Sequence, residues 1–437
     1  MRPPTSDRRF AYQVAEVGPL EGAGFRLMPA LVLIGCVGFN AGLALVNGHI
    51  MPLPPALVIA AEGMLVSAAL GLAMLGWKPQ MAPSLALIAL LVLFATFRGL
   101  LMAQPEPKFL RDVLLIPTFL MLGMSFDERG LARTILVLHT IVFLVFLLEA
   151  IAPRAYSDLL HIQDYYVNTR GNKLDEFYNT NSELFISATR PDERFFSFVD
   201  APRLSSIFLE PVSLGNYCSI VTGFVCACFR RLGWPAVTYL ALTTLAMLVG
   251  CDGRLATATC VLIVMVAVVA PWLPPRSHVL YLPLALAFVF ALVIGADLKP
   301  GTDDFAGRLA HTVELLRNYD VAEMLGLSNE YLTKSMDSGV AYLIMTQSVL
   351  GLLLLWAYVA WGAREDTAEQ VRFTHTLSLY LALSMLVSYS FLTIKTGAVL
   401  WFIQGALQGA SVRYASRKFA APENSKLLAK EKNSWAR

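Results

Sequence analysis

Residues 55–77 read PALVIAAEGMLVSAALGLAMLGW, an apolar run in which Glu62 is the only ionisable side chain. A helix needs about 20 residues to cross a hydrocarbon core of roughly 30 Å, so this run is long enough to span a membrane. Similar runs recur through all 437 residues, which are 56% hydrophobic and 15% charged, with a mean hydropathy of +0.59. Such values exclude an ordinary soluble domain and indicate a polytopic membrane protein.

About twelve runs of this kind are predicted to cross the membrane. Every backbone polar group in lipid needs an internal partner, and the runs lack the alternating pattern of a membrane barrel, so each is expected to be a helix. The predicted fold is therefore an all-α bundle, with a single transmembrane domain over residues 1–437. The expected spans are Leu27–Val46, Pro55–Trp77, Ser84–Phe97, Phe109–Met124, Leu131–Ala152, Ile207–Phe229, Pro235–Gly250, Leu255–Leu273, Val279–Ala296, Ser338–Trp361, Phe373–Ile394 and Thr396–Ala410.

The distribution of Lys and Arg predicts the orientation of the bundle. Positive residues favour the cytoplasmic side of a membrane, and placing the amino terminus there collects most of them on that side, including a basic tail from Arg413 to Arg437. Both termini are then cytoplasmic, in agreement with an even number of spans. A net charge of +2 gives no reason to expect nucleic acid as a partner, and the tail is expected to face lipid. The short outer connections hold only Arg98, Lys108, Arg111, Arg254 and Lys395.

Two long connections, residues 153–206 and 297–337, are predicted to lie on the outer side. The first combines Asp, Asn and Arg with aromatic residues, which favours a folded cap over a disordered linker. Its rings, among them Tyr165, Tyr166 and Phe195, are expected to stack on sugars. The second is predicted to contain a short helix that begins near Asp303 or Asp304. Its apolar face, formed by Phe305, Leu309, Val313 and Leu316, is expected to lie on the bundle or at the membrane interface.

Cations in and beside these connections are candidate ligands for phosphate. The planar guanidinium group can hold phosphate oxygens in a bidentate manner and stays charged where water is scarce, so a cluster of them suits a lipid-linked diphosphate. The alternative is that each arginine lies at a helix end and snorkels to the headgroups. For Arg254, a local salt bridge with Asp252 is a further alternative. The candidates are Arg203, Arg254, Arg308 and Arg317.

Three residues are candidates for a general base. Glu210 precedes Pro211 at the threshold of the sixth span, where an ionisable group is costly unless it faces a partner or a wet cavity. His311 has a side chain that titrates near neutral pH, although a lone histidine on an amphipathic helix is more often a surface group. Asp337 and Ser338 begin the tenth span, where their position favours a simple N-cap, but an N-cap aspartate that faces the cavity could also bind an acceptor hydroxyl.

Other polar residues in the spans have a simpler interpretation. Glu62, His139 and Glu149 are expected to make hydrogen bonds between helices, and Arg111 is expected to pair with Asp112. The sequence contains no Walker loop, no Asp-x-Asp motif, no nucleophile elbow and no His-Glu-x-x-His. ATP-driven, metal-dependent and serine-hydrolase chemistry are therefore disfavoured, and no metal or cofactor is expected.

A set of motifs resembles the bacterial polysaccharide polymerase and O-antigen ligase superfamily, in particular polymerases of xanthan-type exopolysaccharides. The set comprises Arg203-Leu-Ser-Ser-Ile-Phe-Leu-Glu210-Pro211, the Gly253-Arg254 turn, Gly307-Arg308, and Asp337-Ser338 leading to Gly351. It covers roughly residues 153–361, and no single motif is specific. The resemblance implies a metal-independent polymerase at the periplasmic face of the bacterial inner membrane, joining oligosaccharides carried on undecaprenyl diphosphate, with a flippase and a chain-length regulator as further partners.

The resemblance also implies roles for the candidate residues. The arginines would neutralise the departing lipid diphosphate, and a carboxylate or histidine would accept the proton of the attacking hydroxyl. Ligases of the superfamily usually have a histidine near the position of Asp337, which favours a polymerase over a ligase. A flippase for lipid-linked oligosaccharide fits twelve spans equally well, although the concentration of polar residues in two outer connections favours the polymerase. A structural partner of a synthase is a third alternative.

Overall fold

The computed structural model describes residues 23–126, 128–173, 184, 188, 194–199, 202–301 and 305–409, and every regular element in these ranges is helical. The basic tail from Arg413 and the predicted helix start at Asp303 or Asp304 lie outside the described residues. The helices are α1 (Ala23–Val37), α2 (Phe39–His49), α3 (Pro55–Leu75), α4 (Ala82–Met102), α5 (Pro107–Ser125), α6 (Glu128–Ile151), α7 (Pro153–Leu160), α8 (Ile162–Arg170), α9 (Pro211–Leu232), α10 (Trp234–Cys251), α11 (Arg254–Val269), α12 (Tyr281–Gly295), α13 (Phe305–Asn318), α14 (Val321–Met324), α15 (Leu332–Ser335), α16 (Gly339–Trp356), α17 (Ala368–Met385) and a helix over residues 394–409.

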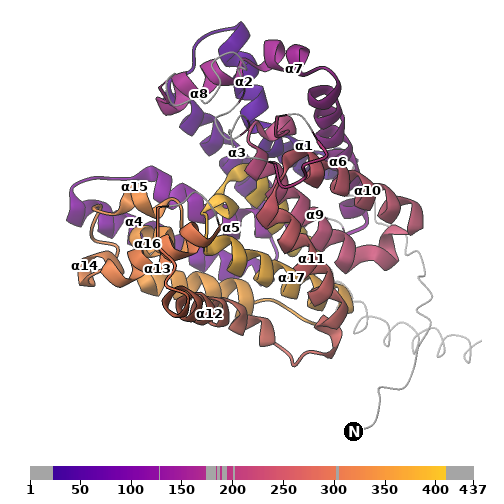
Figure 1. Ribbon diagram of the computed structural model, residues 1–437. Helices are drawn as coiled ribbons and strands as arrows, with labels where there is room; N and C mark the ends of the chain where they lie inside the picture. The colour runs from indigo at the N-terminus through magenta and orange to yellow at the C-terminus, as the bar shows by residue number, and fades with distance from the viewer. Residues whose placement is uncertain are drawn as a thin grey trace, which may run out of the picture.

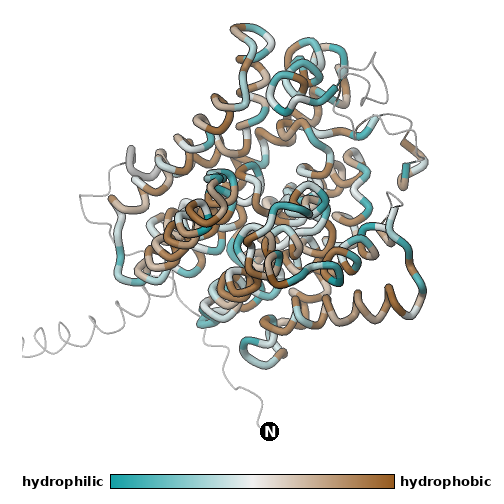
Figure 2. The backbone as a smooth tube through the Cα atoms, turned by 90° about the vertical axis from the view of Figure 1, so that its left-hand side faces the viewer, coloured by the Kyte–Doolittle hydropathy of each residue, from teal (hydrophilic) through white to brown (hydrophobic). Residues whose placement is uncertain are grey.

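The prediction of an all-α membrane protein is confirmed. Among the described residues, eight helical segments are long and apolar enough to cross a membrane, and α1 with α2 forms a ninth, bent by 63°, if the pair is one span. Large apolar side chains on α3, α4, α11 and α12 are exposed, as lipid-facing helices require. Figure 2 shows these hydrophobic helices joined by more hydrophilic connections at their ends. The chain is therefore a multi-pass membrane protein.

Three of the twelve expected spans, the fourth, eleventh and twelfth, form helices that are not among the eight. They correspond to α5, α17 and helix 394–409, which are buried among the other helices over most of their length. Because their side chains meet protein instead of lipid, they carry more polar residues than the outer helices do.

Two central helices, α5 and helix 394–409, cross with their backbones in direct contact. A Cβ atom on Gly123 would overlap the carbonyl of Phe402, and one on Gly405 would overlap the carbonyl of Leu120. A Cβ atom on Gly409 would lie 2.8 Å from the Met124 carbonyl. Small residues permit this close approach of membrane helices. The crossing therefore fixes the position of α5 relative to helix 394–409.

The first long connection begins with two short helices that form a cap. In Figure 1, α7 and α8 lie together with α2 at one end of the molecule. Polar contacts join the cap to α2, since Asn168 donates to Asn47 over 3.1 Å. Tyr165 and Tyr166 are buried in its core, so the expectation that these two rings stack on sugars is wrong; Phe195 is exposed. Phe177 and Tyr178 lie outside the described residues.

The second long connection contains the predicted amphipathic helix, which is α13. Its Leu309 and Val313 are buried against Val289 and Val293 of α12. Phe305, expected on the same face, is half exposed. The helix thus lies against the bundle beside α12, with Arg308 and His311 on the part that remains accessible.

Candidate functional site

The segment that ends at Glu210 is held in place by the buried carboxylate of Glu149. The backbone N–H groups of Ser205 and Ser206 donate to Glu149 Oε2 over 2.8 and 2.6 Å, and the Tyr156 hydroxyl donates to the Ser206 carbonyl over 2.6 Å. Leu209 then adopts a left-handed conformation with φ 62°, which sharply turns the chain into α9. Glu210 is the residue preceding the helix, and its side chain is thereby aimed at the cap.

Four donors surround the Glu210 carboxylate. Arg170 Nη2 lies 2.6 Å from Oε1 and Lys395 Nζ lies 2.6 Å from Oε2. The Tyr166 and Ser213 hydroxyls donate to the same group over 3.1 and 2.9 Å. The guanidinium of Arg170 in turn lies 4.5 Å above the Tyr166 ring. Glu210 therefore joins the cap, α9 and helix 394–409 in one ionic network.

The network determines the protonation state of Glu210, which lies just before the span Pro211–Leu232. Burial alone would raise the pKa of the carboxyl, but Arg170 and Lys395 outweigh burial and hold the pKa well below its usual range. Glu210 is consequently a strong counter-ion. A carboxylate with so low a proton affinity is a poor proton acceptor.

A second ionic group lies on α3 and α5. Arg111 Nη1 lies 2.8 Å from Glu62 Oε2, and Arg111 Nη2 lies 2.7 Å from Asp112 Oδ1, which confirms the predicted pairing of Arg111 with Asp112. The Tyr342 hydroxyl of α16 donates to Asp112 Oδ2 over 2.6 Å. This group is electrostatically linked to the first, because Lys395 and Glu62 interact. The two groups together form the polar cluster of the protein.

Lys108 is the cation of this cluster that lacks a carboxylate partner within ion-pair distance among the described residues. Its Nζ lies 5.4 Å from the centre of the Tyr389 ring and 5.9 Å from that of Tyr342. The two rings stack on each other with centroids 4.7 Å apart. Lys108 is half-buried. A desolvated cation over an aromatic pair is suited to an anion that carries a flat apolar or sugar face.

The short segment η8 (Ser390–Leu392) and its neighbours connect the parts of the cluster. Asn216 of α9 donates to Ser390 over 2.8 Å, and Tyr389 stacks on Tyr342 of α16. Gly339, at the start of α16, has room for no side chain because a Cβ atom would lie 2.5 Å from the Ser388 carbonyl. The N-terminal ends of α9 and α16 thus meet at η8.

The charge of the polar cluster favours an anionic ligand. It contains four cations and three carboxylates, so one positive charge is left over. The ends of two helices that meet there add their positive N-terminal dipoles. The members of the cluster are Glu62, Lys108, Arg111, Asp112, Tyr166, Arg170, Glu210, Tyr342, Tyr389 and Lys395.

Two of the four predicted arginines flank the turn between α10 and α11. Arg203 donates from Nε to the Cys251 carbonyl over 3.0 Å and from Nη2 to the Asp252 carbonyl over 3.3 Å, at the end of α10. Arg254 is exposed at the start of α11. The Asp252 carboxylate accepts the N–H groups of Phe195 and Phe196 and lies 4.0 Å from Arg194 Nε.

The other predicted residues gather at α13 and the start of α16. Arg308 Nη1 lies 3.9 Å from Asp337 Oδ1, and His311 Nε2 lies 2.9 Å from the Lys334 carbonyl. The alternative role of Ser338 is confirmed: it is the N-cap of α16 and accepts the Ala341 N–H over 3.3 Å. Arg317 is exposed at the end of α13. The structure thus joins Arg308 to Asp337, whereas Glu210 is contacted by Arg170 and Lys395.

The residues that sequence reasoning missed are Lys108, Arg170, Lys395, Tyr342 and Tyr389. One signal was available, because Lys108 and Lys395 belong to the few cations in the short outer connections. A grouping of potential metal ligands in the described residues, His278, Glu365 and His375, lies near the start of α17 and not at the polar cluster, which adjoins the segment after its end. No family model, curated protein or solved structure matches this chain.

Proposed function

We propose that the protein is a polymerase that joins oligosaccharide units carried on undecaprenyl diphosphate into a polysaccharide at the periplasmic face of the bacterial inner membrane. The proposed topology has twelve spans, both termini in the cytoplasm and residues 153–206 and 297–337 outside. The twelve spans comprise the eight apolar segments, the bent pair of α1 and α2, and the central helices α5, α17 and 394–409. The expected partners are the bilayer, the lipid-linked substrate, a flippase and a chain-length regulator.

The observation that carries this proposal is Lys108 over the stacked rings of Tyr342 and Tyr389, beside a cluster with excess positive charge. A diphosphate linked to a sugar needs both features, cations for its phosphates and an aromatic surface for its ring. In this proposal Lys108 and Arg111 hold the diphosphate, with Arg203, Arg254, Arg308 and Arg317 lining its approach.

The reaction needs no redox change. An acceptor hydroxyl attacks the anomeric carbon of the donor sugar, the bond from that carbon to the phosphate oxygen breaks, and undecaprenyl diphosphate leaves with the electron pair. The hydroxyl proton passes to a base. Among the three candidates, Asp337 and His311 suit this role better than Glu210. His311 uses Nε2 toward the Lys334 carbonyl, which leaves a lone pair on Nδ1 of the neutral ring.

A flippase for the same lipid is the second candidate, and the broken helices favour it. Ser348 has φ 68° and ψ 166° in the middle of α16, and α1 and α2 form a bent pair. Discontinuous helices line the substrate path of many transporters. The proposed binding of lipid-linked diphosphate is common to both candidates. An O-antigen ligase would use the same donor with a lipid acceptor.

One reconstitution experiment separates these candidates. The purified protein is placed in vesicles with a lipid-linked repeat unit in a buffer without added divalent metal, and products are resolved by size. Chain extension supports the polymerase, transfer to an added lipid acceptor supports the ligase, and transbilayer movement without extension would refute both in favour of the flippase.

A further inference from the structure

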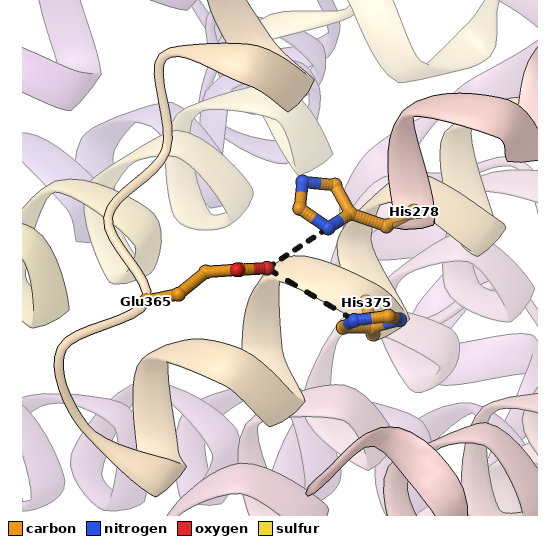
Figure 3. A group of neighbouring side chains, drawn as sticks. All are labelled: His278, Glu365 and His375. Atoms are coloured by element: carbon orange, nitrogen blue, oxygen red, sulfur yellow. Dashed lines mark ion pairs between the residues drawn. The ribbon is translucent and has the colours of Figure 1, made fainter. Parts of the chain in front are cut away.

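Three potential metal ligands from separate segments converge near the start of α17. His278 belongs to the segment η6 (Ser277–Leu280) that precedes α12, Glu365 to the connection after Trp361, and His375 to the first turns of α17. Figure 3 shows the Glu365 carboxylate pointing between the two imidazole rings. Its Oε1 lies 3.0 Å from His278 Nδ1 and 4.0 Å from His375 Nε2, and all three atoms lie within 4.8 Å of one another.

The hydrogen bond of His278 identifies which ring nitrogen carries the proton. Its Nε2 lies 2.7 Å from the Ala360 carbonyl, which can only accept, so Nε2 donates. In the neutral ring, Nδ1 then presents a lone pair. His278 is completely buried, and neither its Nδ1 nor Glu365 Oε1 has a hydrogen-bond partner among the described residues. Two lone-pair atoms 3.0 Å apart repel each other unless a positive charge lies between them.

The outer contacts of the three residues match those of metal ligands. Histidine ligands usually bind a backbone carbonyl or another polar group through the second ring nitrogen, which fixes the ring. His278 contacts the Ala360 carbonyl in this way, and His375 Nδ1 lies 2.7 Å from the Tyr281 hydroxyl. Glu365 Oε2 accepts the backbone N–H of Arg276 over 3.0 Å, so Oε1 is left to point inward.

The donor set and the spacing indicate the class of ion. Two imidazole nitrogens and one carboxylate oxygen are a known ligand set for Zn²⁺, with bond lengths of roughly 2.0–2.2 Å that place neighbouring ligand atoms roughly 3.3 Å apart. The two separations from Glu365 Oε1, 3.0 and 4.0 Å, bracket this value, and the two imidazole nitrogens lie within 4.8 Å of each other. Three ligands leave a fourth position for water. Calcium and magnesium prefer oxygen ligands and fit the set poorly.

We propose that His278 Nδ1, Glu365 Oε1 and His375 Nε2 bind a divalent ion of the zinc class that ties the start of α12 to the start of α17. The site goes beyond the proposed polymerase function and does not depend on it, because it lies at the start of α17 while the polar cluster adjoins the segment after the end of α17. In this proposal the ion holds these two segments together and takes no part in glycosyl transfer.

The test is metal binding by the full chain in detergent micelles. The protein is stripped with a chelator, dialysed, loaded with Zn²⁺ or Co²⁺ and passed through gel filtration. We expect about one ion per chain, a Co²⁺ absorption spectrum of four-coordinate type, and a rise in Tm on loading. Glu365→Gln and His375→Gln should weaken binding by at least about tenfold.

Two variants serve as controls. Glu369→Gln removes a nearby carboxylate that pairs with Arg231, and His139→Gln removes a buried histidine that contacts Thr243 over 2.7 Å. Both should retain the ion. If the wild-type chain retains no more zinc or cobalt than Glu365→Gln, the proposal is overturned, and a shared proton joins His278 to Glu365 instead. The wild-type Co²⁺ spectrum decides the question even if a ligand variant does not fold.

Discussion

Lys395 Nζ lies 2.6 Å from Glu210 Oε2, across 185 positions of sequence. Both side chains are largely withdrawn from solvent, with exposures of 4% and 14%. The pair joins the N-terminal end of α9 to helix 394–409. Arg170, which belongs to the cap, binds the other oxygen of the Glu210 carboxylate. The residue that resembles a catalytic base in the sequence is thus the centre of an ionic junction between three parts of the fold.

Breaking this junction from one side should be costly. Glu210→Gln leaves Lys395 and Arg170 without their shared counter-ion, and removal of one partner of a buried pair typically costs about 3–5 kcal/mol. Lys395→Met should cost a similar amount. The double variant should lose less than the sum of the two, with a coupling of about 1–3 kcal/mol in a denaturant unfolding cycle. Additive losses would mean that the two side chains do not interact.

The stability conferred by Glu210 should depend on pH in one direction. Because Arg170 and Lys395 depress the pKa of the folded carboxyl, its contribution is fully present above the unfolded pKa of about 4.3 and is lost as pH falls through the lower, folded value. The difference in Tm between the wild type and Glu210→Gln should therefore be constant from neutral pH to about pH 5 and shrink below about pH 4. Glu314→Gln, at an exposed position, controls for general surface charge. A difference in Tm between the wild type and Glu210→Gln that grows as the pH falls would contradict the depressed pKa of Glu210.

Lys108→Gln should weaken binding of the lipid-linked donor by about tenfold, equivalent to about 1.4 kcal/mol, because it removes the cation above the Tyr342 and Tyr389 rings. The measurement is the KM of chain extension together with binding of a fluorescent polyprenyl diphosphate.

The matched control for Lys108 is Arg372→Gln. Arg372 also lies over an aromatic ring, that of Phe229 at 5.2 Å, but on α17 near its start. Equal losses in both variants would show that the Lys108 effect is not specific to the polar cluster.

Arg308→Ala and Arg203→Ala should both leave the protein inserted and stop polymer growth, but they should differ in stability. Arg308 is one third exposed and its contact with Asp337 Oδ1 is 3.9 Å long, so loss of that contact should change Tm little. Arg203 binds the carbonyls that end α10, so its loss should also lower stability by about 1–3 kcal/mol. Thermal unfolding and product size are measured on the same preparations.

The control for these two arginines is Lys299→Ala, an exposed cation in the connection that precedes α13. It should retain full polymer growth. Normal growth in both arginine variants would remove them from the diphosphate site.

Gly405→Ala should be among the most destabilising single substitutions, by more than about 3 kcal/mol, because its Cβ atom would overlap the Leu120 carbonyl of α5. Gly63→Ala, on α3 with nothing within 4 Å, is the matched control and should be neutral or stabilising by up to about 1 kcal/mol. The two variants are compared by their yield of monodisperse protein and by their Tm. Comparable behaviour of the two variants would contradict the backbone contact between the helices.

Hydropathy was sufficient to predict the helical membrane fold and most of its spans, because lipid-facing helices are selected for apolar side chains over their full length. It described α5, α17 and helix 394–409 less well, since helices that pack on other helices need shape and hydrogen bonds more than hydropathy. Tyr166 illustrates the same limit. An aromatic residue in a polar connection reads as a surface ring, yet it is buried beneath Arg170.

The site was harder to predict because its contacts join distant parts of the chain. Arg203 and Glu210 are near in sequence, but Arg203 binds the end of α10 while Glu210 binds Arg170 and Lys395. Arg308 and Asp337, by contrast, lie in one connection, and the structure brings them together. His278, Glu365 and His375 follow no spacing motif, so sequence alone did not reveal them.

The crossing of α5 with helix 394–409 has a mechanical consequence. Helices whose backbones touch have no side chains between them that can re-pack, so neither can rotate or slide past the other without breaking contact. Lys108 and Arg111 at the start of α5 and Lys395 at the start of helix 394–409 therefore keep a constant spacing. For the proposed polymerase, we infer that a chain being lengthened advances past stationary charges.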